Sequence, residues 1–255
     1  MVRGLYTAAM GMNVQAKRLD LVSNDLANAG TTGYKKDVAS ISSFKEEYLA
    51  RLNDYQNFEP NNAIIGKITF GAKIDGVYTD FTQGSVIATN LETDFAIQGD
   101  GFFTVQMPNG PAYTRDGNLS INQFGQLVTK EGYAVMGQEG AIELGEDYFS
   151  QSSPLVIKEN GEIYVGNAYI DTLDIANFAD PRSLQKMDDN LYTSNGERVP
   201  FTGTIIQNFL EASNISTVSS MVDMITVARA YEMNQKMVQT QDNLLGKAVN
   251  ELGRG

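Results

Sequence analysis

Apolar residues recur every seven positions near both ends of the chain. They are Leu5, Met12, Leu19 and Leu26 in the N-terminal segment, and Met224, Tyr231, Val238, Leu245 and Leu252 in the C-terminal segment. A seven-residue apolar repeat is typical of a helix that packs along a narrow seam against another helix. The pattern therefore predicts a long helix at each end of the chain, and we expect the two helices to pair as a coiled-coil-like helical domain.

Glycines and short polar residues suggest where these helices end and begin. Gly30 and Gly33 follow the last apolar repeat of the first segment, where a left-handed C-terminal cap would stop the helix. Ser213 or Asn214 could cap the start of the second helix. The sequence thus predicts an N-terminal helical segment at 1–34 that pairs with a C-terminal helical segment at 206–255.

The middle of the chain has a different pattern. All six prolines and 17 of the 24 glycines lie between positions 60 and 203. Short runs of β-branched and aromatic residues alternate there with turn dipeptides such as Asn109-Gly110 and Asn160-Gly161. This pattern predicts a central antiparallel β domain over 66–205, which makes the fold class α+β.

A connector is expected between the first helix and the β domain. Residues 35–65 contain Phe44, Tyr48, Leu49 and Leu52 in a moderately helical spacing. We therefore expect this segment to connect the first helix to the β domain.

The terminal segments are rich in amides and poor in charge outside the apolar seam. The amides are Asn13, Gln15, Asn24, Asn28, Asn234, Gln235, Gln239, Gln241 and Asn243. A solvated helix face normally carries many lysines and glutamates, so this surface is interpreted as one that neighbouring copies cover. An ordinary intramolecular helical hairpin explains the seams equally well but explains the uncharged outer face less well.

The composition and charge of the chain exclude several classes of function. The net charge is −12, and residues 1–30 and 208–255 together sum to zero, so the acidic excess lies in the middle of the chain. An acidic chain does not favour binding to a phosphate backbone, so no nucleic-acid partner is expected. Histidine, cysteine and tryptophan are absent, which removes thiol nucleophiles, histidine acid–base relays and the common zinc sites. No cofactor is expected.

No run of 18 apolar residues occurs, and the N-terminus lacks the pattern of a cleaved secretion signal. We therefore expect neither direct membrane insertion nor a cleaved signal peptide.

Three acidic residues were considered for catalysis. Asp94, Asp100 and Asp116 could supply the acid pair of a glycosidase, but Asp100 and Asp116 stand in glycine-flanked turn contexts. Asp116, Asn118, Ser120 and Asn122 alternate as in a calcium loop, yet Leu127 stands where the bidentate acid belongs. The turn interpretation is favoured, and no catalytic, metal or cofactor-binding residue is predicted.

Three stretches resemble the flagellar basal-body rod and hook protein family. Residues 4–8 and 23–35, with Asn24, Asn28, Gly33 and Tyr34, resemble its N-terminal signature. Residues 94–105, with Gly99 and Gly101, and residues 113–117 and 125–128 resemble its central β domain. Residues 210–214, ending in Asn214, and residues 229–234, with Arg229, Tyr231 and Glu232, resemble its C-terminal signature, although Ala228 stands where a glutamine is usual.

The resemblance implies a structural subunit of the bacterial flagellar basal-body rod, and not an enzyme. It implies that the terminal helices build the inner tube of an axial assembly while the β domain projects outward. The implied partners are other copies of the chain, neighbouring rod and hook subunits, and the flagellar type III export apparatus. Export through that apparatus, without a cleaved signal, would place the chain in the basal body outside the cytoplasmic membrane. Phe44 and Tyr48 have a spacing that fits engagement of the export gate.

Two other hypotheses stay open from the residues alone. One is a secreted β-domain enzyme that acts on cell-wall glycan, and the other is a soluble coiled-coil adaptor that dimerises. Under the rod hypothesis the terminal helices are expected to be poorly ordered in the free monomer, because isolated helices are marginal in water until they pack. Whether the chain is a proximal or a distal rod subunit is left open.

Overall fold

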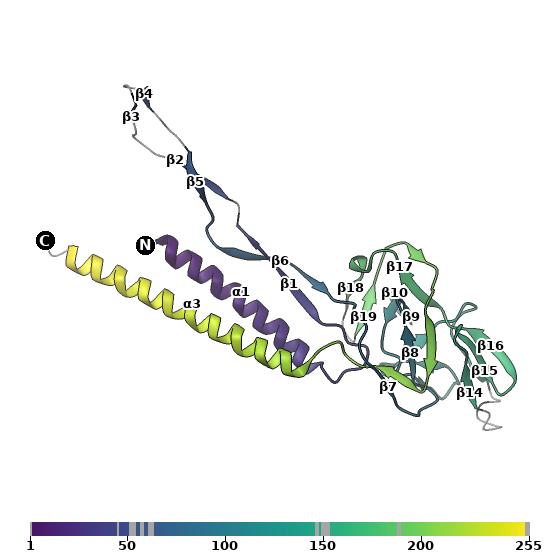
Figure 1. Ribbon diagram of the computed structural model, residues 1–255. Coiled ribbons are helices and arrows are strands. Elements are labelled where there is room, and N and C mark those ends of the chain that lie inside the picture. The colour runs from purple at the N-terminus through teal and green to yellow at the C-terminus, as the bar shows by residue number, and fades with distance from the viewer. Residues whose placement is uncertain are drawn as a thin grey trace. The chain divides into compact units, whose positions relative to one another are not determined.

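The computed structural model describes residues 2–44, 46–50, 55–56, 59–60, 64–145, 148, 154–187 and 190–252. The chain forms two units (Figure 1). The helical unit comprises Met1–Leu26, Asp37–Tyr78 and Thr217–Gly255, and the β unit comprises Ala27–Lys36 and Thr79–Ser216. The predicted combination of terminal helices with a central antiparallel β region is confirmed.

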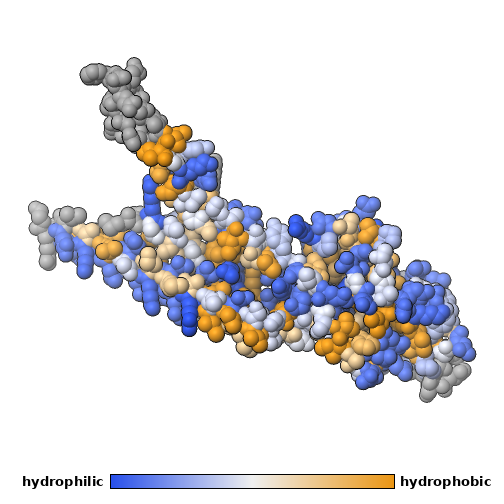
Figure 2. Space-filling model, viewed as in Figure 1, coloured by the Kyte–Doolittle hydropathy of each residue, from blue (hydrophilic) through white to orange (hydrophobic). Residues whose placement is uncertain are grey.

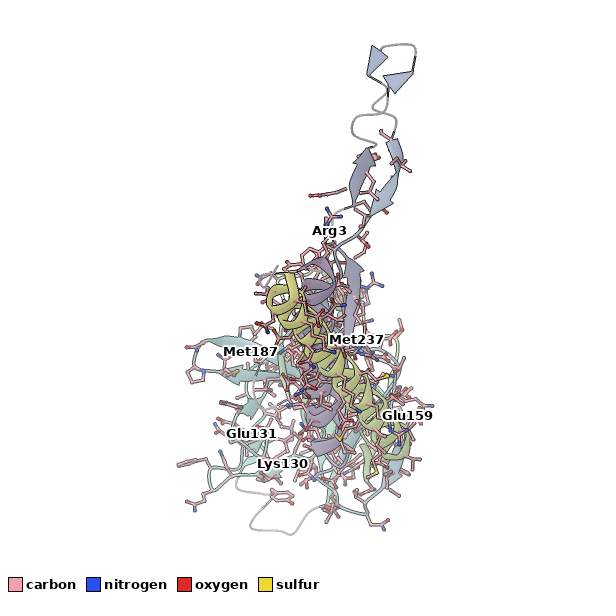
Figure 3. The ribbon with its side chains drawn as sticks, turned by 90° about the vertical axis from the view of Figure 1, so that its left-hand side faces the viewer. Arg3, Lys130, Glu131, Glu159, Met187 and Met237 are labelled. Carbon is pink, nitrogen blue, oxygen red and sulfur yellow. The ribbon has the colours of Figure 1, made fainter. Side chains whose placement is uncertain are left out.

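Two long helices lie side by side in the helical unit and run in opposite directions (Figures 1 and 3). They are α1 (Val2–Ala27) and α3 (Thr217–Leu252). A Cβ atom placed on Gly4 would lie 3.3 Å from Gln241 Nε2, and one placed on Gly11 would lie 3.0 Å from Asn234 Nδ2. Seven residues forward along α1 thus correspond to seven residues back along α3, as expected for two antiparallel helices in close contact.

The side of α3 that is shielded from solvent follows alternating steps of three and four residues. Its positions include Ser220, Met224, Val227, Tyr231, Asn234, Val238, Gln241, Leu245 and Ala248. This spacing keeps one stripe of a helix facing the same direction over its whole length.

Paired strands complete the helical unit. β1 (Asp37–Ser43) pairs with β6 (Ala72–Thr79), β2 (Glu47–Ala50) pairs antiparallel with β5 (Ile64–Ile68), and β3 (Tyr55–Gln56) pairs with β4 (Glu59–Pro60). A Cβ atom placed on Gly71 would lie 3.4 Å from Met10 Cβ, so this ribbon passes close to α1.

The moderately helical spacing of 35–65 does not produce a helix, since the described part of that segment forms strands. Asp37–Ser43 contains the β-branched residues Val38 and Ile41, which favour strands, and its serines are weak helix formers. The strands β5 and β6 supply the pairing partners, so residues 64–78 belong with the helices and not with the β domain predicted at 66–205. Leu52 lies outside the described residues.

The strands of the β unit are short. They are β7 (Val86–Ala88), β8 (Phe95–Gln98), β9 (Phe102–Met107), β10 (Gly110–Thr114), β11 (Ser120–Ile121), β12 (Leu127–Val128), β13 (Ala134–Val135), β14 (Leu155–Ile157), β15 (Glu162–Val165), β16 (Ala168–Thr172), β17 (Ile175–Phe178), β18 (Gln185–Lys186), β19 (Leu191–Thr193), β20 (Arg198–Val199), β21 (Thr204–Gln207) and β22 (Phe209–Glu211). A 3-10 helix, η1 (Pro181–Ser183), precedes β18.

The strands form one large sheet and several small ones. The large sheet has nine strands in the order β11-β12-β13-β9-β10-β19-β18, with β17 also paired to β9 and β20 paired to β17. β14, β15 and β16 form a separate sheet. The last two strands return to the start of the unit, since β21 pairs with β8 and β22 pairs with β7.

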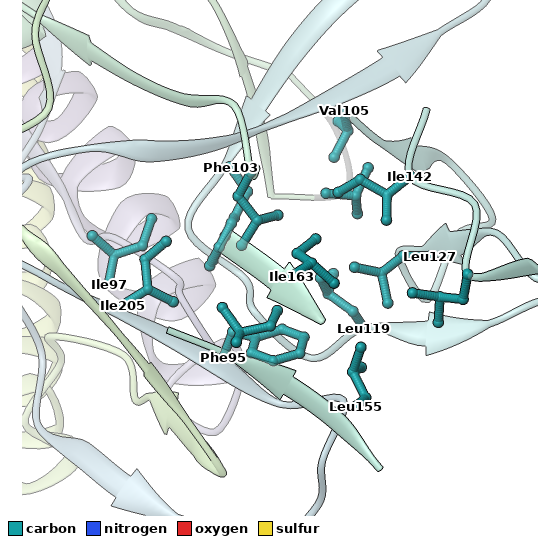
Figure 4. Packing of buried hydrophobic residues seen from close by; sticks show 14 of the residues in the cluster. Phe95, Ile97, Phe103, Val105, Leu119, Leu127, Ile142, Leu155, Ile163 and Ile205 are labelled. Carbon is teal, nitrogen blue, oxygen red and sulfur yellow. The ribbon is translucent and has the colours of Figure 1, made fainter. Parts of the chain in front are cut away.

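An apolar core fills the β unit (Figure 4). Phe95, Phe103, Leu127, Ile163 and Ile205 are fully buried. They come from β8, β9, β12, β15 and β21, so strands from both ends of the unit contribute to one core.

The helices are shorter than the predicted segments. Residues 28–36 belong to the β unit, because Gly33 has a φ of +66° and its N–H donates to Glu211 O at 2.8 Å. Residues 206–211 fall largely in β21 and β22, so α3 begins at Thr217 and neither Ser213 nor Asn214 caps it. A turn after α1 and the strands β21 and β22 before α3 occupy residues that the sequence pattern assigned to helices.

Candidate functional site

The predicted assembly residues on α1 and α3 are mostly shielded from solvent. Leu5, Met12, Leu19 and Leu26 on α1, and Met224, Tyr231, Val238 and Leu245 on α3, are all partly buried. The Leu252 side chain lies outside the described part of the structure. The most deeply buried side chains of the two helices include Ala8, Val14 and Val227, small apolar residues that allow a close approach.

Two of the amides expected on the outer face of α3 lie on its shielded side instead. Asn234 and Gln241 are partly buried and lie opposite Gly11 and Gly4. A glycine leaves room for an amide on the neighbouring helix, which explains why polar residues occupy the shielded side. The other C-terminal amides, Gln235, Gln239 and Asn243, are exposed as expected.

Large apolar residues are exposed at several positions around α3, both at the edges of its shielded side and away from it. We define the α3 outer face by its exposed large apolar residues, which are Val218, Met221, Val222, Ile225, Met233, Met237, Leu244 and Val249. Met233 is 61% exposed and Met237, labelled in Figure 3, is 54% exposed. In the view of Figure 2, hydrophobic and hydrophilic residues alternate along the surface of α3. A helix with apolar residues on both its shielded and its outward side is typical of one that contacts more than one neighbour.

A cluster of three buried charges joins distant parts of the β unit. Glu211 lies between two cations, with Oε1 2.6 Å from Lys35 Nζ and Oε2 2.6 Å from Arg115 Nε. The side chains of Lys35 and Glu211 are 1% exposed and that of Arg115 is 5% exposed. The partners lie 176 and 96 residues from Glu211 in the sequence. Charges this deeply buried are stable only when they are paired and hydrogen-bonded.

The cluster is well supplied with hydrogen bonds. Lys35 Nζ also donates to Thr82 O at 2.8 Å, and the Gly84 N–H donates to Glu211 Oε1 at 2.9 Å. Arg115 donates to the carbonyls of Gly101 and Gly99. The two motif glycines thus form the turn that receives the guanidinium, with φ values of +106° for Gly99 and +153° for Gly101.

Burial and neighbouring charges shift the pKa values of Glu211 and Lys35 in opposite directions. Burial alone would raise the pKa of Glu211, but Arg115 and Lys35 outweigh it and hold the pKa below its ordinary value. Burial lowers the pKa of Lys35, although Glu211 opposes this effect. We take both groups as charged, because a 2.6 Å contact with a carboxylate that also faces Arg115 favours the ammonium form.

The remaining motif residues divide between the two units. Gly33 and Tyr34 are buried in the β unit, where Lys186 Nζ lies 4.1 Å from the centre of the Tyr34 ring. Asn28 Oδ1 accepts a 3.3 Å hydrogen bond from Thr31 Oγ1. Asn24 on α1 and Arg229 and Glu232 on α3 are exposed, and Tyr231 is partly buried in the helical unit. Asn214 lies in the β unit, just before α3.

The acids considered for catalysis have structural contacts. Asp116 Oδ1 accepts hydrogen bonds from Thr32 Oγ1 at 2.6 Å and from the Asn118 N–H at 3.0 Å, as in a turn. Asp94 is buried at the base of β8, while Asp100 is exposed. Within the described residues no group of three or more acidic side chains is placed to hold a metal ion. Of the helices that the structure describes, none is long and apolar enough to cross a membrane.

The sequence pattern missed the role of the charged cluster. Lys35, Arg115 and Glu211 each stand inside a family motif, but a motif does not show which of its residues meet. A charge beside buried apolar residues, as in Leu210-Glu211-Ala212, is the one local signal of a buried ion pair.

Three family models match the chain in the order of its motifs. They are described as a flagella basal body rod protein (residues 5–35), a flagellar hook protein FlgE/F/G D1 domain (residues 96–165) and a flagellar basal body rod FlgEFG protein C-terminal region (residues 206–251). The flagellar basal-body rod protein FlgG of Borreliella burgdorferi is 35% identical over 98% of both chains. The chain belongs to the flagellar basal-body rod protein family.

Other relatives agree over the whole length. FlgG of Caulobacter vibrioides is 32% identical over 98% of this chain and 99% of its own, and FlgG of Bacillus subtilis is 30% identical over 98% and 99%. This rod-family member is accordingly a structural subunit of the flagellar basal-body rod. The buried cluster lies where the three matched regions meet, since Lys35, Arg115 and Glu211 come one from each.

Proposed function

We propose that this rod subunit polymerises through its helical unit to build the axial drive shaft of the flagellum. In this proposal α1 and α3 pair as a coiled-coil-like hairpin, and the α3 outer face contacts other copies of the chain. The observation that supports it best is the number of large apolar residues that α3 exposes, because monomeric proteins rarely expose an extended apolar surface.

The amount of apolar surface that α3 exposes favours many weak contacts over one tight contact. Full burial of one such side chain is worth about 1.5–3 kcal/mol. The eight side chains of the α3 outer face are roughly half exposed, so covering them all contributes on the order of 10 kcal/mol to the free energy of association. Association itself costs about 4–15 kcal/mol, so one neighbour gives a weak complex. A polymer in which each copy has several neighbours makes such contacts stable.

In this proposal the residues spaced by seven hold the hairpin together. They are Leu5, Met12, Leu19 and Leu26 on α1, and Met224, Tyr231, Val238, Leu245 and Leu252 on α3. Their spacing by seven and the antiparallel approach of Gly4 and Gly11 to α3 support this role. The hairpin is expected to gain helix when copies associate.

The test separates the outer face from the seam. Met237→Glu places a charge on the α3 outer face, Val238→Asp places one in the seam, and Val156→Glu places one on the exposed surface of β14 as a matched control. Light scattering across a concentration series should show open-ended growth for the unmodified chain and for Val156→Glu. Met237→Glu should stop growth and leave the helix content at the level of the dilute unmodified chain, whereas Val238→Asp should stop growth and lower the helix content below that level.

Motility provides the second readout. Cells that carry only Met237→Glu or only Val238→Asp should not swim, whereas Val156→Glu should support swimming. Normal motility in either helix variant would contradict the proposal. A closed dimer with fully helical ends at every concentration would support the soluble adaptor instead, and glycan hydrolysis lost on changing Asp100 or Asp116 would support the enzyme.

We also propose that the chain reaches the basal body, outside the cytoplasmic membrane, through the flagellar type III export apparatus without a cleaved signal. Its proposed partners are other copies of itself, neighbouring rod and hook subunits, and that apparatus.

Phe44 is partly buried and its N–H donates to Gly71 O at 3.0 Å, while Tyr48 is exposed. If the two aromatic residues engage the export gate, Phe44→Ala with Tyr48→Ala should reduce the amount of exported chain, and normal export would contradict this role.

A further inference from the structure

The chain passes between the two units four times. The passages follow Leu26, Lys36, Tyr78 and Ser216. Ala27 stands beside the first passage. Beside the other three stand the segments that we call the first exit (residues 34–36), the second exit (residues 79–82, where the chain re-enters the unit) and the third exit (residues 213–216).

The side chain of Asn214, in the third exit, bonds to both of the other exits. Its Oδ1 accepts a 2.9 Å hydrogen bond from the Lys36 N–H in the first exit. Its Nδ2 donates to Asp80 O at 2.8 Å and to Thr82 Oγ1 at 3.1 Å in the second exit. The Asn214 N–H also donates to Tyr34 O at 3.4 Å. One amide thus joins three segments that are far apart in the sequence.

The first and second exits also bond to each other. The Asp80 N–H donates to Lys36 O at 2.9 Å, and Lys36 Nζ lies 3.4 Å from Asp80 Oδ2. The Thr82 N–H donates to Asp80 Oδ1 at 3.0 Å. These bonds close a ring of contacts in which every exit is bonded to the other two.

An amide side chain suits this place for a chemical reason. Asparagine can accept a hydrogen bond from one backbone segment and donate to another at the same time. Aspartate could accept from Lys36 but could not donate to Asp80 O, and alanine could do neither. Since α3 begins only at Thr217, the Asn214 side chain is not used as a helix cap.

We propose that Asn214 is a positioning residue that ties the three exits into a single hydrogen-bonded junction, so that the chain leaves and re-enters the β unit at one fixed place. This role does not depend on polymerisation. It concerns how the β unit holds its own connections to the rest of the chain.

Hydrogen exchange on the full chain tests the proposal. The variants are Asn214→Ala, which removes every side-chain bond, and Asn214→Asp, which keeps the acceptor and removes the donor. Asn122→Ala is the matched control, because Asn122 Oδ1 accepts from the Phe124 and Gln126 N–H groups within a single turn.

The informative amide is that of Asp80, whose acceptor is Lys36 O and not Asn214. In Asn214→Ala we expect the amides of Lys36 and Asp80 to exchange about two- to tenfold faster, the effect of losing one ordinary hydrogen bond. In Asn214→Asp the Lys36 amide should stay protected while the Asp80 amide exchanges faster. The core strands β9 and β15 should be unchanged in both, and Asn122→Ala should leave all three exits unchanged.

Three results would overturn the proposal. If Asn214→Ala speeds exchange at Lys36 alone, Asn214 makes only a local bond. If exchange rises in β9 and β15 as well and the melting temperature of the β unit falls to match, Asn214 is a general stabiliser. If no exit exchanges faster, the junction holds without it.

Discussion

Glu211→Gln should strongly destabilise the β unit. The change keeps the size of the side chain and removes the negative charge that lies 2.6 Å from both Lys35 Nζ and Arg115 Nε. Two cations are then left facing each other with almost no access to water. Breaking a buried ion pair by removing one partner typically costs about 3–5 kcal/mol, because the remaining charge stays buried without compensation.

That cost is large compared with the free energy of unfolding of a typical domain, which is about 5–15 kcal/mol. For a domain of this size each kcal/mol lowers the melting temperature by about 2–4 °C, so the expected fall is roughly 6–20 °C. Thermal unfolding followed by near-ultraviolet circular dichroism, which reports the buried tyrosines Tyr34, Tyr113 and Tyr192, measures it.

The control is Glu162→Gln on β15. Glu162 pairs with Lys158 at 3.0 Å on the exposed side of its sheet, so its loss should change the melting temperature little. Adding Lys35→Met to Glu211→Gln should recover part of the loss, because it removes one of the two uncompensated cations. If Glu211→Gln melts within the error of Glu162→Gln, the buried cluster does not stabilise the fold and the reasoning is refuted.

Three further predictions concern the same region. The pKa of Glu211 is depressed in the folded state, so the ionised carboxylate stabilises the fold fully at pH values above the ordinary glutamate pKa. This stabilisation is lost as the pH falls through the lower folded-state pKa. The free energy of unfolding should therefore fall less steeply with acid in Glu211→Gln than in the unmodified chain. Gly33→Ala should cost more than about 2 kcal/mol in urea unfolding, because a Cβ atom there would lie 2.5 Å from the Arg115 carbonyl carbon and the φ of +66° is strained for alanine; an unchanged midpoint would contradict this. A fragment of residues 27–216 should fold by itself, whereas 35–207 should not, because it lacks Gly33, Glu211 and the strand β22 that pairs with β7; equal near-ultraviolet spectra for the two fragments would show that the ends are dispensable.

The sequence predicts the helices well because their signal is periodic and local. A repeat of seven from Met224 to Leu245 marks one side of α3, and this side is shielded in the structure. The concentration of prolines and glycines between 60 and 203 likewise reflects short strands joined by turns. Such patterns depend only on neighbouring residues, so a single sequence carries them.

The parts that sequence reasoning missed depend on residues that meet from far apart. The strand Asp37–Ser43 needs a partner some 35 residues later, and its own residues do not show where that partner lies. Asn234 and Gln241 look like surface amides until the antiparallel register places Gly11 and Gly4 opposite them. Nothing near Glu211 in the sequence tells which cations it meets.

The two ends of the β unit lie beside each other, since the Gly33 N–H donates to Glu211 O at 2.8 Å. A domain with adjacent ends can be enlarged, reduced or exchanged without altering the path of the chain outside it, which is why nature and engineers insert whole domains at such places. The β unit thus lies between α1 and α3 in the sequence, interrupted only by residues 37–78, which belong to the helical unit. One helical unit can therefore carry β modules of different size, provided that each new module returns its last strand next to its first residues.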